Sequence, residues 1–258
     1  MRNRPEYLYF GMICALTGVL SFGAPVLVQG AEADHSMEGQ IHKPENSQEQ
    51  PIRDDATDNT YGFYTIMGDT TVTEEDLVSH YMAQNLEYPG EILGQGGAAT
   101  IEEFCSIVVE EAQAEQVRGE IVFEQSMLET GWLQFPGVCK AQQYNFAGLG
   151  ATGGEEPGIS FPDVRTGIRA QVQHLKAYAS SEDLNQDCVD ERFELVARES
   201  APYVEWLGIQ ENPYGGGWAA GEGYGVKLRT LLAELKGETY TETSQIETQM
   251  QDSAAKEQ

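Results

Sequence analysis

Apolar residues recur at intervals of three and four positions through most of residues 61–236, which is the spacing of helices with one buried face. The clearest run begins at Thr100, where Thr100 and Glu103 have the spacing of a capping box. After this start, the apolar positions are Ile101, Phe104, Cys105, Val108 and Ala112. The pattern therefore predicts a long amphipathic helix from Thr100 onward.

The same spacing predicts further helices along the segment. They are expected from Thr73 to Tyr81, from near Glu120 to Gly131, from Ile168 to Ala179, from Phe193 onward, and from Tyr224 to Leu235. Strand patterns are sparse, and the glycine-rich stretch 148–162 suits a loop or a short hairpin. We therefore expect a mainly α fold with a small β-hairpin lobe.

The two ends of the chain differ from this central block. Arg2 and Arg4 precede an apolar run over 7–28 and then Ala31-Glu32-Ala33, a pattern typical of a secretory signal peptide at 1–33. An uncleaved membrane anchor is the alternative, but the small-x-small site favours cleavage. Residues 34–60 are polar and acidic and predict a disordered linker, and 237–258 predict a disordered polar tail. The catalytic or binding domain is therefore assigned to 61–236.

Charge and cysteine usage narrow the function. The chain has 42 acidic against 15 basic residues and a net charge of −27, which excludes a nucleic-acid binder with a basic face and argues against docking on anionic membranes. After signal cleavage Cys105, Cys139 and Cys188 remain, enough for one disulfide or for three free thiols. The four histidines are scattered, so neither a metal site nor a cofactor is expected.

The strongest chemical candidate is Glu129, near the end of the apolar helix that stops at Gly131. Apolar neighbours such as Leu128 and the negative end of the helix dipole would both raise its pKa. A carboxyl that stays protonated near neutral pH is what a general acid for glycosidic cleavage requires. A glutamate in a last helical turn can also face water with no catalytic role.

Two motifs carry a resemblance to a known family. Leu128-Glu129-Thr130-Gly131-Trp132, followed by Tyr144-Asn145-Phe146-Ala147-Gly148-Leu149, resembles the Leu-Glu-Ser-Gly-Trp and Asn-Asn-x-Phe-Gly pattern of bacterial glucosaminidases. These form glycoside hydrolase family 73, named after mannosyl-glycoprotein endo-β-N-acetylglucosaminidase, and the resemblance implies a lysozyme-like fold over 61–236. Within the family the chain looks like the secreted cell-wall hydrolases of clostridia and their relatives.

The resemblance implies roles for individual residues. Glu129 matches the general acid, and Asn145 matches the second Asn of the family pair, which shapes the loop beside the substrate. Tyr144 stands where the family has the first Asn. Tyr224 matches a tyrosine that the family places by the catalytic site, although a role in core packing is equally open.

A second carboxylate, to activate water, is expected on a hairpin after this loop. The resemblance makes Glu155 and Glu156 the candidates, with Asp163 a more remote one. The segment is shorter than the family's usual hairpin, and a solvated acidic loop is the simpler interpretation of either glutamate taken singly. Trp132, Trp218 and Tyr214 are candidates for stacking on sugar rings.

Together these features predict a secreted, extracellular or wall-associated monomer that cleaves the β-1,4 bond after N-acetylglucosamine in peptidoglycan glycan strands. After signal cleavage no membrane partner is expected. Two alternatives remain open. A lytic transglycosylase shares the implied fold and also relies on one glutamate, and a glycan-binding module without catalysis would need no second carboxylate.

Overall fold

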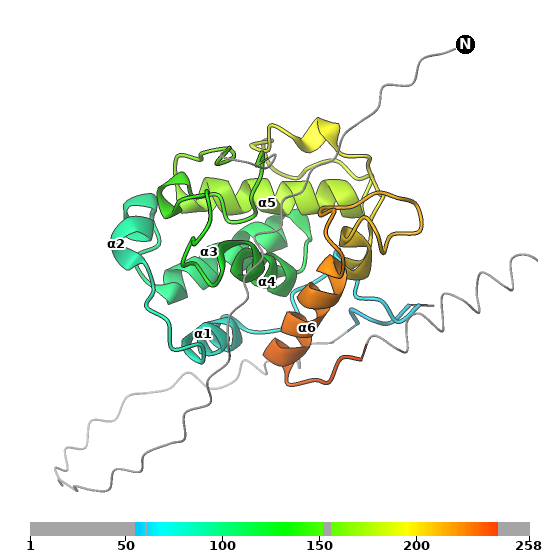
Figure 1. Cartoon of the computed structure of the whole chain (residues 1–258), viewed down its shortest axis with the longest axis horizontal. Coiled ribbons are helices and arrows are strands. Elements are labelled where there is room, and N and C mark those ends of the chain that lie inside the picture. Colours follow the sequence, from blue (N-terminus) through cyan, green and yellow to red (C-terminus); the bar gives the residue numbers. More distant parts are fainter. Residues whose placement is uncertain (1–54, 60, 152–155, 242–258) are drawn as a thin grey trace, which may run out of the picture. The chain divides into compact units, whose positions relative to one another are not determined.

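The computed structural model describes residues 55–59, 61–151 and 156–241, and in these ranges the chain forms helices joined by loops (Figure 1). The α-helices are α1 (Glu74–Met82), α2 (Gly90–Leu93), α3 (Ile101–Glu115), α4 (Gly119–Thr130), α5 (Val164–Ala179) and α6 (Tyr224–Lys236). Short 3-10 turns form at η1 (Gly94–Gly96), η2 (Ala141–Gln143), η3 (Phe193–Leu195) and η4 (Val204–Leu207). The mainly α prediction is confirmed. No helix of the described ranges is long and apolar enough to cross a bilayer.

Three sequence-predicted helix boundaries are confirmed by their cap geometry. The side chains of Thr73 and Thr100 each accept a hydrogen bond from the third amide of their helix. The carboxylates of Asp76 and Glu103 in turn accept a hydrogen bond from the backbone N–H of the cap residue. Gly131 ends α4 in the left-handed conformation at φ 59°. These caps satisfy helix-end groups that would otherwise lack partners, so local sequence alone sets the ends.

Helix α4 lies at the centre of the helices and packs against α3, α5 and α6 (Figure 1). Every residue from Gly119 to Met127 is buried. A helix surrounded on all sides shows no single apolar face. Its polar side chains must therefore find partners inside the protein, and this requirement shapes the site at its C-terminal end.

One polar group of α4 lacks a complete set of partners. The Glu124 carboxylate is fully buried, and neither of its oxygens accepts a hydrogen bond from the described residues. His80 Nε2 lies 3.3 Å from Glu124 Oε1. Burial raises the pKa of Glu124 well above its ordinary value, and Glu234 adds to the rise, while burial lowers the pKa of His80. Both groups are therefore driven towards their neutral forms.

Replacing Glu124 by glutamine should stabilise the protein at pH 7. The native pKa is raised above the unfolded value of about 4.3, so this carboxyl stabilises the fold most below that pH and loses its contribution as the pH rises. Glutamine cannot ionise, so Glu124→Gln should gain on the order of 1–2 kcal/mol at pH 7 and little at pH 4. Thermal melts at both pH values measure this. A lower melting temperature at pH 7 would instead mean that an ionised Glu124 pairs with protonated His80.

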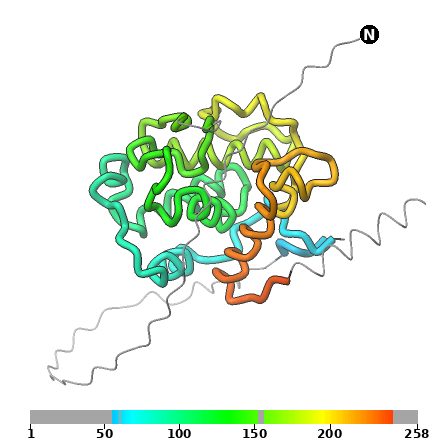
Figure 2. Tube along the Cα trace, viewed as in Figure 1, coloured from blue at the N-terminus to red at the C-terminus, as the bar shows by residue number. Residues whose placement is uncertain are grey.

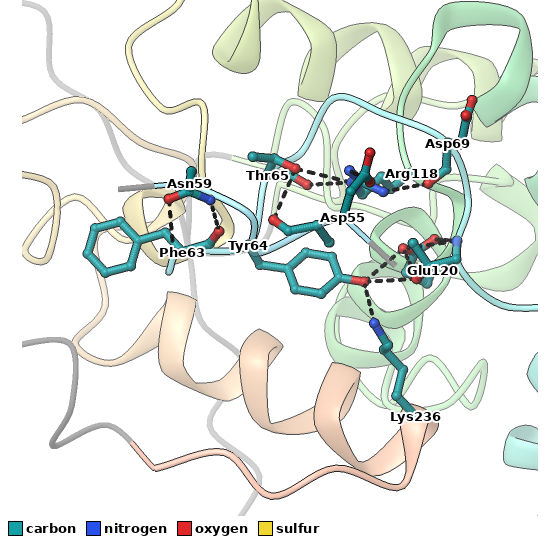
Figure 3. Close-up of polar contacts among 11 residues, drawn as sticks. Asp55, Asn59, Phe63, Tyr64, Thr65, Asp69, Arg118, Glu120 and Lys236 are labelled. Carbon is teal, nitrogen blue, oxygen red and sulfur yellow. Dashed lines mark hydrogen bonds and ion pairs between the residues drawn. The ribbon is translucent and has the colours of Figure 1, made fainter. Parts of the chain in front are cut away.

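The described residues before α1 contact helix α6 and the start of helix α4. They run beside α6 (Figure 2), where the Arg229 guanidinium lies 4.6 Å from the centre of the Tyr64 ring. The Tyr64 hydroxyl donates to Glu120 Oε1 at 2.8 Å, in the first turn of α4 (Figure 3). Arg118, just before α4, donates to the Thr65 and Asp69 carbonyls and pairs with Asp55 at 2.7 Å (Figure 3). These contacts anchor the N-terminal end of the helix that carries Glu129.

Three expectations differ from the structure. The hairpin lobe is not seen in 148–151 and 156–162, where backbone bonds from Ala151 N to Gly148 O and from Ile159 N to Leu149 O form loops. The helix expected from Phe193 is the single turn η3, because the chain beyond it turns back to give amides to the C-terminal carbonyls of α5. Residues 55–59 fall inside the predicted linker, yet Ala56 is fully buried. The predicted signal peptide at 1–33 lies outside the described residues.

Candidate active site

Glu129 occupies the last turn of α4, where the central helix reaches the surface. Its side chain is half-buried, whereas Gln125, one turn earlier, is completely buried. Burial raises the pKa of Glu129 to about 7, and the hydrogen bond from Tyr224 opposes part of that rise. The carboxyl is therefore protonated in a large fraction of molecules at neutral pH while still accessible to a ligand.

A left-handed turn follows Glu129 and fixes the next candidate, Trp132. Gly131, Trp132 and Leu133 all have φ near 60°. This conformation costs about 1–2 kcal/mol for a residue with a Cβ, and such strain concentrates at functional sites. Bonds from Trp132 N to Met127 O at 2.8 Å and from Leu133 N to Thr130 Oγ1 at 2.9 Å stabilise the turn. The half-buried Trp132 ring consequently lies against His80, with ring centres 5.3 Å apart.

Tyr224 opens α6 and points its hydroxyl at Glu129. The distance from Tyr224 Oη to Glu129 Oε1 is 2.7 Å, and Gln125 Nε2 lies 3.0 Å from the same hydroxyl. Burial first, and then the nearby Glu129, raise the pKa of Tyr224 well above 10, so it keeps its proton and acts as a donor. Of the two interpretations open from the sequence, the structure shows both at once: Tyr224 is 3% exposed and also contacts the candidate acid.

The loop containing Asn145 and Gly148 faces the other oxygen of the carboxyl. Gly148 has φ +65°, and a Cβ placed on it would lie 3.7 Å from Glu129 Oε2. Asn145 holds this loop: its side-chain amide donates to Leu149 O at 2.8 Å and to Ile159 O at 3.0 Å, and its oxygen accepts from Leu149 N. Asn145 is 1% exposed. Its side chain therefore shapes the loop from within.

The remaining aromatic candidates lie in two different environments. Trp218 packs edge-on against His174, with ring centres 4.9 Å apart, and joins an apolar cluster with Ala147 next to Gly148. Trp218 thus lies beside the loop that faces Glu129. Tyr214 is 74% exposed and packs on Trp206, which belongs to a separate group of aromatic rings with Tyr61.

Comparison with known proteins assigns the chain to a protein family. The family model described as "Glucosaminidase: Mannosyl-glycoprotein endo-beta-N-acetylglucosaminidase" matches residues 105–237, a range that contains Glu129, Asn145 and Tyr224. The chain belongs to the glucosaminidase family. Membership places it among glycoside hydrolases of the peptidoglycan-hydrolase type, whose substrate is a glycan.

Two further comparisons concern this member of the glucosaminidase family. A protein of Borreliella burgdorferi, described as uncharacterized, is 41% identical over 161 residues, which cover 62% of the present chain and 72% of the relative. No solved structure shows a significant match.

The candidates for a second carboxylate have different positions. Glu156 is exposed on the loop after the Gly148 turn, and Glu155 lies outside the described residues. Asp163 is the N-cap of α5: its carboxylate accepts from Thr166 N at 2.7 Å. This bond gives Asp163 a structural role at the start of α5.

Two residues near the acid are not among the site residues predicted from the sequence. Gln125 lies one helical turn before Glu129, so the i, i+4 spacing could have pointed to it. Gln171 of α5 donates to Gln125 Oε1 at 3.0 Å. Nothing local in the sequence predicts this contact, because it depends on how α5 packs on α4.

Proposed function

We propose that this glucosaminidase hydrolyses the β-1,4 bond after N-acetylglucosamine in peptidoglycan glycan strands, with Glu129 as the general acid. The observation that supports it is the half-buried Glu129, whose pKa burial raises to about 7 and whose carboxyl accepts a hydrogen bond from the Tyr224 hydroxyl. Acid-assisted cleavage needs a carboxyl that a ligand can reach and that still holds its proton near neutral pH.

The chemistry follows from these contacts. Protonated Glu129 gives its proton to the bridging oxygen as the bond to the anomeric carbon breaks, and positive charge develops on the sugar. The carboxylate left behind is stabilised by the bond from Tyr224, which strengthens as Glu129 becomes charged. Water then adds to the anomeric carbon and loses a proton, and Glu155 or Glu156 is proposed as the group that takes it.

Three aromatic side chains are proposed to help hold the glycan. Trp132 lies three residues after Glu129, in the left-handed turn that ends α4, and Trp218 lies beside the Gly148 loop, so we propose that both stack on sugar rings flanking the scissile bond. Exposed Tyr214 would extend this contact along the strand. We also propose that the protein acts as a monomer. We propose that it is secreted and works outside the cytoplasmic membrane, because the pattern at 1–33 is typical of a secretory signal peptide.

Digestion of purified peptidoglycan in water enriched in heavy oxygen tests the reaction type. Hydrolysis should release fragments with reducing-end N-acetylglucosamine that carry one heavy oxygen, as read by mass spectrometry. Unlabelled anhydromuramic ends would instead identify a lytic transglycosylase. Binding to the wall with no new ends would identify a binding module, and either result would overturn the proposal.

Replacing Tyr224 by phenylalanine should both slow the enzyme and shift its pH dependence. A hydrogen bond to a charged group contributes about 1.5–3 kcal/mol, so kcat should fall roughly tenfold to a hundredfold. The hydrogen bond from Tyr224 lowers the pKa of Glu129, so removing the hydroxyl should raise that pKa. The alkaline limb of kcat/KM, the decline expected near pH 7 in the wild type, should therefore move to higher pH. Tyr88→Phe, which removes a hydroxyl bonded to the Ala98 carbonyl, is the control. An unshifted limb in Tyr224→Phe would contradict the assigned contact.

A further inference from the structure

A chain of buried polar groups extends from Glu129 into the core and ends on the backbone. Glu129 Oε1 is bonded to Tyr224 Oη at 2.7 Å, and Tyr224 Oη to Gln125 Nε2 at 3.0 Å. Gln125 Oε1 is bonded to Gln171 Nε2 at 3.0 Å, and the same Nε2 is 3.0 Å from Val122 O. Gln125 and Gln171 are both 0% exposed. The chain links α4, α5 and α6 at the level of the candidate acid.

The backbone carbonyl at the end fixes the direction of every bond in this chain. Val122 O can only accept, so the NH₂ group of Gln171 must face it. The other hydrogen of that NH₂ goes to Gln125 Oε1, which turns the Gln125 NH₂ towards Tyr224. Since the Tyr224 oxygen then accepts, its single proton is directed to Glu129 Oε1.

A hydroxyl next to the chain is compatible with this orientation, and the Val122 carbonyl decides it. Ser126 Oγ lies 2.9 Å from Gln171 Oε1 and 2.8 Å from Val122 O, so its proton is donated to one of two acceptors. Turning Gln171 over would place its oxygen against the Val122 carbonyl, with no proton between two buried acceptors. The packing of α5 on α4 therefore selects one direction.

We infer that Gln171 and Gln125 are positioning residues that make Tyr224 a one-way donor to Glu129 Oε1, and so leave Oε2 as the oxygen that carries and delivers the acid proton. The inference rests on the proposed function. Oε2 is the oxygen facing Gly148, where the absence of a Cβ leaves room beside it. In the protonated acid, Oε1 accepts from Tyr224 and the proton resides on Oε2. After transfer, the carboxylate keeps the Tyr224 bond.

The test is a double-mutant cycle between Gln171→Met and Tyr224→Phe, measured as kcat and as the pH dependence of kcat/KM on peptidoglycan. Without the Gln171 amide, the Gln125 side chain is free to turn over and present its oxygen to Tyr224. Tyr224 can then donate to Gln125, so its hydrogen bond to Glu129 weakens. Gln171→Met should lower kcat by about threefold to tenfold, which corresponds to the loss of part of one hydrogen bond. It should also move the alkaline limb upward, as Tyr224→Phe does. In the Tyr224→Phe background, Gln171→Met should have no further effect.

A matched control is available on the same helix. Gln173 of α5 is also 0% exposed, but its side chain bonds Asp187 O, Val189 N and Asp190 N and has no part in the chain to Glu129. Gln173→Met removes a buried amide of the same kind, so it should match Gln171→Met in melting temperature without moving the limb. If Gln171→Met does not fold, Gln125→Met in the same cycle tests the neighbouring member of the chain.

The outcomes separate this inference from the function on which it rests. If Glu129→Gln retains activity, the proposed function fails and the inference fails with it. If Glu129→Gln and Tyr224→Phe lose activity as proposed but Gln171→Met has an unshifted limb and an effect additive with Tyr224→Phe, only the positioning role is overturned. A shifted limb with no additivity supports the role.

Discussion

Glu129→Gln is expected to reduce the rate of peptidoglycan cleavage by about a thousandfold or more. General acid catalysis contributes roughly 10²–10⁴ in rate, and glutamine preserves the shape of the side chain while removing the transferable proton. Glu129 is half-buried, and burial raises the pKa of its carboxyl to about 7, so a proton is held there near neutral pH. The measurement is the initial rate of release of reducing ends by wild type and variant at equal protein concentration.

The stability of the same variant excludes unfolding as the cause of a loss. The native pKa of Glu129 is raised to about 7, whereas the unfolded value is about 4.3. The native state thus holds the proton over this range, so wild-type stability declines between the two pH values and Glu129→Gln escapes that decline. The variant should melt at a higher temperature than wild type at pH 8 and at a similar one near pH 4. A folded variant with wild-type activity would remove Glu129 from the mechanism.

Lys176→Met is expected to destabilise the fold by about 3–5 kcal/mol, because it leaves a charge buried without its partner. Lys176 Nζ lies 2.9 Å from Glu115 Oε2, and both side chains are almost completely buried. Glu115 also accepts from Asn185 N and Gln186 N, so one carboxylate joins α3, α5 and the segment after α5. The free energy of unfolding of a natural protein is only about 5–15 kcal/mol, so the expected loss is a large share of it.

Urea denaturation of wild type, Lys176→Met and Glu110→Ala measures this effect against a surface pair. Glu110 contacts Arg165 at 2.7 Å, but both side chains are about half exposed, and such pairs contribute about 0–1 kcal/mol. Adding Glu115→Gln to Lys176→Met removes the buried charge and should recover part of the loss. A loss for Lys176→Met as small as that of Glu110→Ala would show that the buried carboxylate does not need its counter-charge.

Local features explain which parts of this structure could be predicted from the sequence. The capping boxes at Thr73 and Thr100 and the stop at Gly131 depend on residues within a few positions, and all were predicted. The motif around Glu129 likewise led to the family that the chain belongs to. The helix predicted from Phe193 is only a single turn, because the chain after it is held by hydrogen bonds to the end of α5. Those partners are distant in sequence.

The candidate site shows the same division. Glu129 was identified from its helix end, but the chain through Gln125 and Gln171 required the packing of three helices. Glu124 lies on the same central helix, and its burial without a hydrogen-bond donor among the described residues has no local signature either. Polar residues on a helix that is buried on every side have roles that depend on partners elsewhere in the chain, which periodicity does not reveal.

The most direct test of the central claim is the titration of Glu129 itself. Carboxyl resonances of the ¹³C-glutamate-labelled protein, compared with those of Glu129→Gln, would identify its signal and give its midpoint without reference to activity. We expect a midpoint at about pH 7, raised by burial. A midpoint near the ordinary value of about 4.3 would show that Glu129 is ionised at neutral pH and would contradict its role as the acid.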